Sequence, residues 1–373
     1  MKNRNARVLA FYLPQFHPVP ENDRWWGKGF TEWTNVGKAK SLFPGHYQPA
    51  VPSDLGYYDL RVAETREEQA KLAREYGIEG FVYWHYWFKK DRRLLERPFN
   101  EVLASGKPDF PFALAWANES WKGRWHGLME GKTLIEQEYG GDEDYIAHFH
   151  AVLPAFKDPR YITCEGKPVF FIYKPDLMPD PQHFISLWRK LAEENGLPGL
   201  CFIAGASIDK SKENSVAYYD KMISFGFDMV NNHNFIKSLK LPCWLRLMRS
   251  LFFKRIHLLP DIRQYETSIF DGPIDARENV IPSVYSGWDN TPRAGKNGVI
   301  LHGFSPKTFK QALKSAIDKI KHKPLEKRIL MIKSWNEWAE GNYLEPDIRW
   351  GRSLLEAIKD VVCESSSIVE SSK

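Results

Sequence analysis

The amino-acid sequence predicts an α/β fold, a (β/α)8 TIM barrel, in which eight parallel strands alternate with helices around a closed sheet. Eight short apolar segments alternate along the chain with longer segments that carry apolar residues at helical spacing, the order expected of a parallel sheet. Polar and aromatic residues gather directly after several apolar segments, where such a barrel has its working residues. A doubly wound open sheet also fits the alternation, but neither a G-x-G-x-x-G motif nor a phosphate-binding loop supports it.

The predicted strands are apolar runs that are too short to be buried helices. They span residues 7–12, 78–84, 112–116, 168–173, 200–204, 227–230, 280–285 and 329–335. Pro282 counts against the seventh strand, because proline donates no hydrogen bond in a sheet. The predicted helices span residues 60–76, 94–104, 142–156, 181–195, 213–224, 306–321 and 351–362. We expect one domain over residues 1–363 with long connections after the strands, and a disordered Ser-rich tail at 364–373.

The segment SWNEWAEG at residues 334–341 ends the eighth strand. If the turn there is tight or helical, Glu337 and Glu340 share one face because they are three residues apart. Two like charges at short range push one pKa upward, which yields a proton donor and a base. Cleavage of a glycosidic bond needs such a carboxyl pair, and the two adjacent Trp residues offer faces for sugar rings. The alternative is a solvated loop with two ordinary surface glutamates.

Other side chains near the strand ends are predicted to bind substrate, because aromatic faces stack on sugars and polar side chains bond to hydroxyl groups. They are Tyr12, Gln15, Trp33, Tyr83, His85, Tyr86, Trp116, Asn118, Glu119, Trp121, Trp288, Asp289, Asn290, Arg293, Asn336 and Trp338. Two alternatives stay open here. The segment 288–293 also fits an Asx-turn with an ion pair, and His85 also fits a structural role.

An aromatic segment with Gly residues follows the first strand at residues 25–35. Its large aromatic side chains are hard to bury in a loop, which favours a binding lid. The alternative is a satellite cluster packed beneath the loop.

Residues 232–279 form an irregular insertion. Basic residues recur through residues 237–263, and no acidic residue comes before Asp261. A basic amphipathic helix at 237–257 would contact an anionic membrane surface. The alternative is a helix packed on the barrel with its basic face in water.

Composition excludes several other classes of protein. The net charge of the 373-residue chain is +5, and the absence of a Lys/Arg block argues against nucleic-acid binding. The four Cys residues are widely separated, so we expect no zinc site, no disulfide framework and no metal or other cofactor. Without a signal peptide or an 18-residue apolar run, a cytoplasmic protein is expected, peripheral at the inner membrane face if the insertion binds lipid.

Several motifs resemble those of the WbsX-type proteins: RVLAFYLPQFHP, WWGKGFTEWTNV, YGIEGFVYWHYWF, FPFALAWANESW, SGWDNTPR and SWNEWAEGNYLEPD. The resemblance runs from about residue 7 to residue 355 and extends to the family-99 glycoside hydrolases, the endo-α-mannosidase type. It implies a barrel that acts on a glycan, with Glu337 as general base and Glu340 as general acid. In that family the base takes the proton of the sugar 2-OH, and the 2-oxygen attacks C1 with net retention. The basic insertion is not part of the pattern.

Three functions remain open from the sequence. The first is a retaining glycoside hydrolase or transglycosylase that acts on an oligo- or polysaccharide, which could be lipid-linked. The second is a glycosyltransferase of cell-surface polysaccharide (O-antigen, lipopolysaccharide or capsule) biosynthesis, although no DxD-type stretch supports a metal-dependent sugar-nucleotide enzyme. The third is a glycan-binding barrel without catalytic activity.

Overall fold

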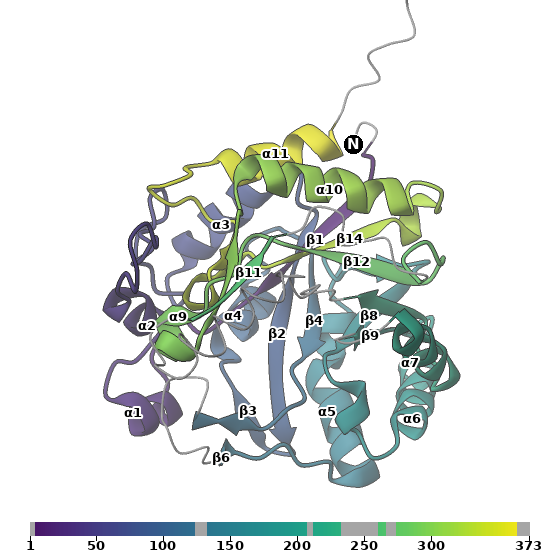
Figure 1. Ribbon diagram of the computed structural model, residues 1–373. Coiled ribbons are helices and arrows are strands. Elements are labelled where there is room, and N and C mark those ends of the chain that lie inside the picture. Colours follow the sequence, from purple (N-terminus) through teal and green to yellow (C-terminus); the bar gives the residue numbers. More distant parts are fainter. Residues whose placement is uncertain (1–3, 124–132, 207–211, 233–259, 266–273, 364–373) are drawn as a thin grey trace, which may run out of the picture.

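The barrel is closed by eight parallel strands (Figure 1). A computed structural model describes residues 4–123, 133–206, 212–232, 260–265 and 274–363 of the chain. The strands follow the order β1, β14, β12, β10, β9, β8, β4 and β2, and pairing between β1 and β2 closes the ring. They are β1 (Arg7–Tyr12), β2 (Gly80–Lys89), β4 (Phe112–Trp116), β8 (Lys167–Ile172), β9 (Cys201–Ala206), β10 (Met229–Asn232), β12 (Val280–Tyr285) and β14 (Ile329–Lys333). The predicted barrel is confirmed.

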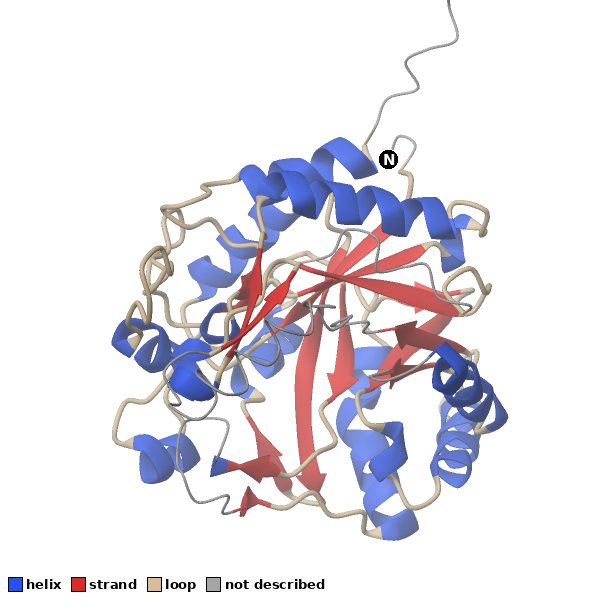
Figure 2. Ribbon diagram, viewed as in Figure 1, coloured by secondary structure: helices blue, strands red, loops and turns tan. Residues whose placement is uncertain are grey.

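Helices surround the barrel on its outer face (Figure 2). They are α3 (Ala63–Glu75), α4 (Arg97–Ser105), α5 (Gly141–Phe156), α6 (Pro181–Glu194), α7 (Lys212–Ser224), α10 (Pro306–Ile320) and α11 (Ser353–Val362). Every residue of β4, β9, β12 and β14 is buried, as expected of parallel strands with one face toward helices and the other toward the barrel interior.

Several short elements were not predicted from the sequence. Among the strands they are β3 (Arg92–Leu94), β5 (Trp121–Lys122), β6 (Thr133–Ile135), β7 (Thr163–Cys164), β11 (Asp261–Gln264), β13 (Val299–His302), β15 (Asn336–Glu337) and β16 (Asn342–Tyr343). The short helical turns are η2 (Pro175–Leu177), α9 (Thr291–Ala294), η4 (Gly295–Asn297), η5 (Leu325–Lys327) and η6 (Trp338–Glu340). Because β3 pairs with the end of β2, β2 extends well beyond its predicted end at residue 84. The helix α4 begins at Arg97 instead of at the predicted residue 94.

The aromatic segment after β1 is largely helical rather than a loop. It contains α1 (Pro20–Trp26) and α2 (Glu32–Lys38), and a capping box between Thr31 and Thr34 starts α2. The ring of Trp33 packs against Tyr58 and Trp338 at centroid distances of 5.1 and 5.4 Å. Trp33 therefore belongs to a packed satellite cluster, which was the alternative to a lid.

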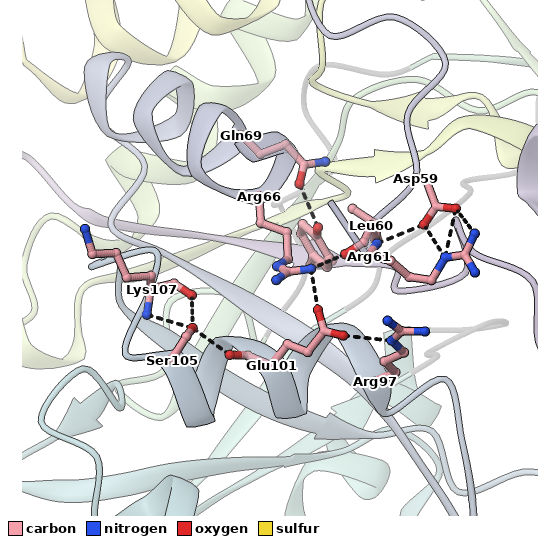
Figure 3. Close-up of polar contacts among 10 residues, drawn as sticks. Asp59, Leu60, Arg61, Arg66, Gln69, Arg97, Glu101, Ser105 and Lys107 are labelled. Carbon is pink, nitrogen blue, oxygen red and sulfur yellow. Dashed lines mark hydrogen bonds and ion pairs between the residues drawn. The ribbon is translucent and has the colours of Figure 1, made fainter. Parts of the chain in front are cut away.

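A polar network connects α3 with α4 on the outside of the barrel (Figure 3). Arg66 is buried and pairs with Glu101 at 2.9 Å, and Arg97 contacts the same carboxylate at 2.7 Å. Arg66 also donates to the carbonyl oxygen of Leu60. One helix turn farther along α3, a separate hydrogen bond of 2.7 Å from the Tyr12 hydroxyl to Gln69 joins this helix to β1 in the barrel wall.

Only part of the insertion lies within the described residues. There, β11 pairs in parallel with β13 beside the barrel. The predicted basic helix at 237–257 and the predicted tail at 364–373 lie outside the described residues. Within the described ranges, no helix has the length and apolar character needed to cross a membrane.

Candidate active site

A cavity of about 310 Å³ opens at the carboxyl ends of the barrel strands. Five aromatic side chains form much of its wall, namely Trp84, Tyr86, Trp121, Tyr173 and Trp288. Its charged lining residues are Glu119, Arg293, Lys333, Glu337 and Glu340. The remaining lining residues are Leu13, Gln15, Ala117, Asn290 and Ala294. Nine residues predicted to form the site thus lie around one cavity: Gln15, Tyr86, Glu119, Trp121, Trp288, Asn290, Arg293, Glu337 and Glu340.

The two-residue period of a strand decides which side chains of β2 reach the cavity. Trp84 and Tyr86 line it, whereas Tyr83 and His85 point to the helical layer. The ring of Tyr83 packs on Phe99 of α4 at 5.3 Å.

His85 contacts a second histidine instead of Glu337. Its Nε2 lies 2.8 Å from Nε2 of His148 in α5. Burial lowers the pKa of both imidazoles well below the usual value, so one neutral ring donates to the other. This contact is the structural alternative considered for His85.

The same alternation places further predicted residues outside the cavity lining. Tyr12 bonds to Gln69 of α3, and the indole nitrogen of Trp116 donates to the Trp87 carbonyl at 2.9 Å. Asn118 is fully buried and bonds to the carbonyl oxygen and backbone nitrogen of Lys174. Leu13, Gln15, Ala117 and Glu119, which occupy the intervening positions, line the cavity.

Four other predicted residues support the loops around the cavity. Trp33 lies in the satellite cluster described above. The side chain of Asn336 accepts a hydrogen bond from the backbone nitrogen of Leu13 and donates one to its carbonyl oxygen. The indole nitrogen of Trp338 donates a hydrogen bond of 2.6 Å to Glu345.

Asp289, the fourth of them, faces a neighbouring hollow. It accepts hydrogen bonds of 2.8 Å from both His46 and Gln48 and others from Thr291, so the Asx-turn interpretation holds for this residue.

The turn after β14 brings the two glutamates together as the spacing predicted. Glu337 ends β15 and Glu340 ends η6, a single tight turn. Glu337 is buried, and its Oε1 accepts from the Trp84 indole at 2.9 Å. Gly341 follows with φ of 63°, and a Cβ there would lie 2.6 Å from the Asp289 nitrogen. Glycine therefore allows this turn to pack closely against the Asp289 loop.

Arg293 links Glu340 to a carboxylate deeper in the protein. One guanidinium nitrogen lies 2.5 Å from Glu340, and another lies 2.6 Å from Glu32 of α2. Glu32 has no exposed side-chain surface and also accepts from Gln15 at 3.3 Å. A buried cation between two carboxylates fixes the position of Glu340 through charge-assisted hydrogen bonds.

The surroundings give the paired glutamates opposite pKa shifts. Burial, reinforced by the charge of Glu340, raises the pKa of Glu337. Burial acts in the same direction on Glu340, but Arg293 and Lys333 outweigh it and lower the pKa of that group. The two carboxyl groups also interact directly. In the free protein, Glu337 therefore holds a proton more readily, and Glu340 is the carboxylate.

The sequence matches the family described as Glycosyltransferase WbsX over residues 8–358. The chain belongs to this family. WxcX proteins from two strains of Xanthomonas campestris pv. campestris are 35% identical to it, over 97% of this chain and 50% of the relative. The chain thus spans about half the length of these curated relatives.

Two solved structures share the fold of this WbsX-family chain. A glycoside hydrolase-like protein aligns with a TM-score of 0.60 and 15% identity, covering 97% of this chain and 95% of the other. The GH99 endo-alpha-mannosidase from Bacteroides thetaiotaomicron aligns with a TM-score of 0.55 and 15% identity, covering 97% and 98%. At this level of identity the likeness shows a common fold.

Besides the apolar lining residues Leu13, Ala117 and Ala294, four aromatic or charged residues at the site of this WbsX-family protein were not predicted from the sequence. Trp84, Tyr173 and Lys333 line the cavity, and Glu32 lies behind Arg293. The two-residue period within the predicted second strand, which ends at residue 84, would have indicated Trp84. Tyr173 and Lys333 directly follow or end apolar strands, which is a signal in itself. Among the residues that the structure describes, no cluster of three or more His, Cys, Asp or Glu side chains could hold a metal.

Proposed function

We propose that this protein is a retaining carbohydrate-active enzyme, a glycoside hydrolase or transglycosylase that acts on a bacterial polysaccharide through Glu337 and Glu340. One observation carries the proposal: two interacting carboxyl groups with opposite pKa shifts face one cavity at the end of a barrel strand. Pairs whose surroundings separate their pKa values supply the donor and the base of acid–base catalysis. Membership of a glycosyltransferase family supports a carbohydrate substrate.

The walls of the cavity suit a sugar ring. Trp84, Trp121 and Trp288 offer indole faces for stacking. Gln15 and Asn290 lie beside them as uncharged polar groups, which bond to hydroxyl groups. Small-molecule sites typically combine aromatic walls with a small number of precisely placed polar groups.

The electrostatic interaction between the two glutamates, which lie on one tight turn, favours retention of configuration. An inverting pair must hold a water molecule between carboxyl groups that are roughly 6.5–9.5 Å apart, and two interacting groups leave no room for it. In the proposed reaction, one carboxyl group protonates the glycosidic oxygen as its bond to C1 breaks. The other removes the 2-OH proton as the 2-oxygen bonds to C1. A water molecule or a sugar hydroxyl then attacks C1 from the opposite face and gives its proton to the carboxylate that acted as the acid. The bond between C1 and the 2-oxygen breaks, and the 2-oxygen takes back a proton from the other carboxyl group.

The acid and base roles can be assigned to the two glutamates in two ways. The family-99 resemblance implies that Glu337 is the base and Glu340 the acid. The pKa shifts of the free protein favour the reverse, because Arg293 keeps Glu340 ionised. Both assignments require the same two residues and the same 2-OH group.

An activated aryl glycoside of the sugar that the enzyme uses distinguishes these assignments. Its leaving group departs as a stable anion and needs no proton, so it rescues only the variant that lacks the acid. Rescue of Glu340→Gln would support the assignment implied by the resemblance, and rescue of Glu337→Gln would support the reverse. Equal rescue of both variants, or normal turnover of a 2-deoxy substrate, would overturn the proposed chemistry.

The family description, a glycosyltransferase, favours a second candidate function. We propose as this alternative a glycosyltransferase of cell-surface polysaccharide biosynthesis, which would work with lipid-linked glycans at the inner membrane face. Purified protein should be incubated with a panel of bacterial polysaccharides, and the products analysed by mass spectrometry. Release of sugar without an activated donor supports the hydrolase or transglycosylase, whereas a strict need for a sugar nucleotide supports the transferase. Binding that survives the loss of both glutamates, without any turnover, would indicate a non-catalytic glycan-binding barrel.

A further inference from the structure

Lys333 places a buried ammonium group in the cavity wall at the carboxyl end of β14. The residue is 8% exposed and lines the cavity. Its Nζ lies 5.5 Å from the ring centre of Trp288 and 5.9 Å from those of Trp84 and Tyr173. Within the described part of the chain, this ammonium group has no hydrogen-bond acceptor and no carboxylate oxygen within 4.0 Å.

Arg293, the other cationic residue that lines the cavity, differs from Lys333 because it has carboxylate partners. Its guanidinium is engaged by Glu32 and Glu340, so its charge is compensated within the protein. Among the described residues, Lys333 instead has aromatic rings as the contacts of its ammonium group, and these attract a cation weakly compared with a hydrogen-bonded anion.

The acidic groups of the cavity leave the ammonium available to a ligand. Glu340 is held by Arg293. Burial raises the pKa of Glu337 and of Glu119, although Lys333 opposes the shift in both cases. Burial acts to lower the pKa of Lys333, but neighbouring acidic groups, Tyr173 and Glu337 first among them, raise it overall. Lys333 is therefore a cation.

A ligand that fills the cavity removes the water that solvates this ammonium group. A buried ion without a partner is strongly unfavourable, so a suitable ligand must bring its own acceptor. Among acceptors, an anionic oxygen forms the strongest hydrogen bond with an ammonium group.

We propose that Lys333 binds an anionic group carried by the glycan, either the carboxylate of an acidic sugar or a phosphate substituent. The substrate class is thus an acidic glycan, and Lys333 is the residue that distinguishes it from a neutral one. The inference depends on the proposed function in taking this cavity as the glycan site. It adds the charge of the substrate, which neither the carboxyl pair nor the aromatic walls specify.

Matched pairs of bacterial polysaccharides test the charge requirement. One set contains uronic-acid polysaccharides and their carboxyl-reduced forms, and the other contains phosphorylated polysaccharides before and after removal of phosphate. We expect the wild-type protein to bind at least one acidic member about 10- to 100-fold more tightly than its neutral counterpart, as for a hydrogen bond to a charged group. The set that shows this preference identifies the anion as carboxylate or phosphate. Equal or tighter binding of the neutral forms, or no binding of any acidic form, would overturn the inference.

Three variants assign the preference to Lys333. Lys333→Met should abolish it and reduce the salt dependence of binding, while Lys333→Arg should keep much of both because the charge remains. Lys174→Met is the matched control, since its ammonium also lies over the Tyr173 ring, at 4.6 Å, but does not line the cavity. Lys174→Met should bind like the wild type. An unchanged preference in folded Lys333→Met, checked by thermal melting, would contradict the assignment.

Failure of this inference and failure of the proposed function give different results. If neutral glycans are cleaved and the cleavage needs Glu337 and Glu340, the proposed function stands and the acidic-substrate inference is wrong. If acidic glycans bind through Lys333 but are never turned over, the inference stands and the proposed catalysis is wrong.

Discussion

Glu337 and Glu345 are both buried carboxyl groups in one short segment, yet their surroundings differ. Glu337 lines the cavity, interacts with Glu340 and lies within the electrostatic influence of Lys333 and Arg293. Glu345 lies outside the cavity lining and is enclosed by uncharged donors. These donors are Tyr58 at 2.9 Å, Gln69 at 2.6 Å and Trp338 at 2.6 Å.

Burial nevertheless raises the pKa of both groups, that of Glu345 to about 7. A shifted pKa therefore does not by itself identify a catalytic residue in this protein. Access to a cavity and a second titratable partner separate Glu337 from Glu345, whose contacts connect the turn at Glu337 and Glu340 to the outer cluster at Tyr58 and to α3. These differences support the proposed catalytic role for Glu337 and predict a role in stability for Glu345.

The largest expected effect is the loss of turnover in Glu337→Gln. General acid–base catalysis contributes about 10²–10⁴-fold, so kcat should fall by that factor on any polysaccharide that the wild type cleaves. The thermal transition should change little, because the amide oxygen of Gln can still accept from Trp84 and the new amino group faces a wet cavity. Glu345→Gln is the matched control and should retain most of the turnover at a temperature where it is folded. Similar losses of kcat in both variants would erase the distinction between the two carboxyl groups.

The second expected effect concerns stability. Here Glu345→Gln should be affected more than Glu337→Gln, the reverse of the effect on kcat. At pH 8, above the pKa of about 7 that Glu345 has in the folded protein, the Glu345→Gln substitution replaces one carboxylate oxygen with an amide nitrogen that faces a donor from Gln69, Tyr58 or Trp338. A buried donor left without an acceptor costs about 1–3 kcal/mol, so the midpoint of urea denaturation should fall clearly below that of wild type. Glu337→Gln should keep a midpoint close to wild type. A midpoint for Glu345→Gln equal to that of wild type would mean that these three hydrogen bonds do not hold the segment.

The fold could be predicted from the sequence because buried parallel strands leave a strong signal. Runs such as residues 329–332 are apolar throughout, and the helices that surround the barrel carry helical periodicity. Strands of two residues, such as β15, have no period to detect, and α2 depends on a capping box in a segment whose aromatic residues were interpreted as a loop.

The candidate site could be predicted in part. The Glu337/Glu340 pair follows from local spacing on a tight turn, so the sequence alone places both residues. The Glu32–Arg293 ion pair joins residues 261 positions apart, and no local pattern indicates such a contact. The facing of His85 and Tyr86 depends on β2 continuing past residue 84, where it pairs with β3.

The smallest expected effect is a pH-dependent difference in stability between wild type and Glu345→Gln. With a pKa of about 7 in the folded protein and about 4.3 in an unfolded chain, Glu345 keeps its proton on folding between these values. The folded state then binds more protons than the unfolded state, so stability falls as pH rises through this range. The contribution is fully present below the unfolded pKa and is lost above the folded pKa. The uncharged glutamine side chain of the variant does not titrate and makes no such contribution.

The free energy of unfolding of the wild type minus that of Glu345→Gln should therefore be larger at pH 5 than at pH 8, measured by urea denaturation in one buffer series. The contribution of Glu337 is common to both proteins and cancels. Burial and the three donors act on Glu345 in opposite directions, because burial favours the neutral acid and the donors favour the carboxylate. A difference that grows with pH would show that the donors prevail, and Glu345 would then be an ionised anchor instead of a protonated one.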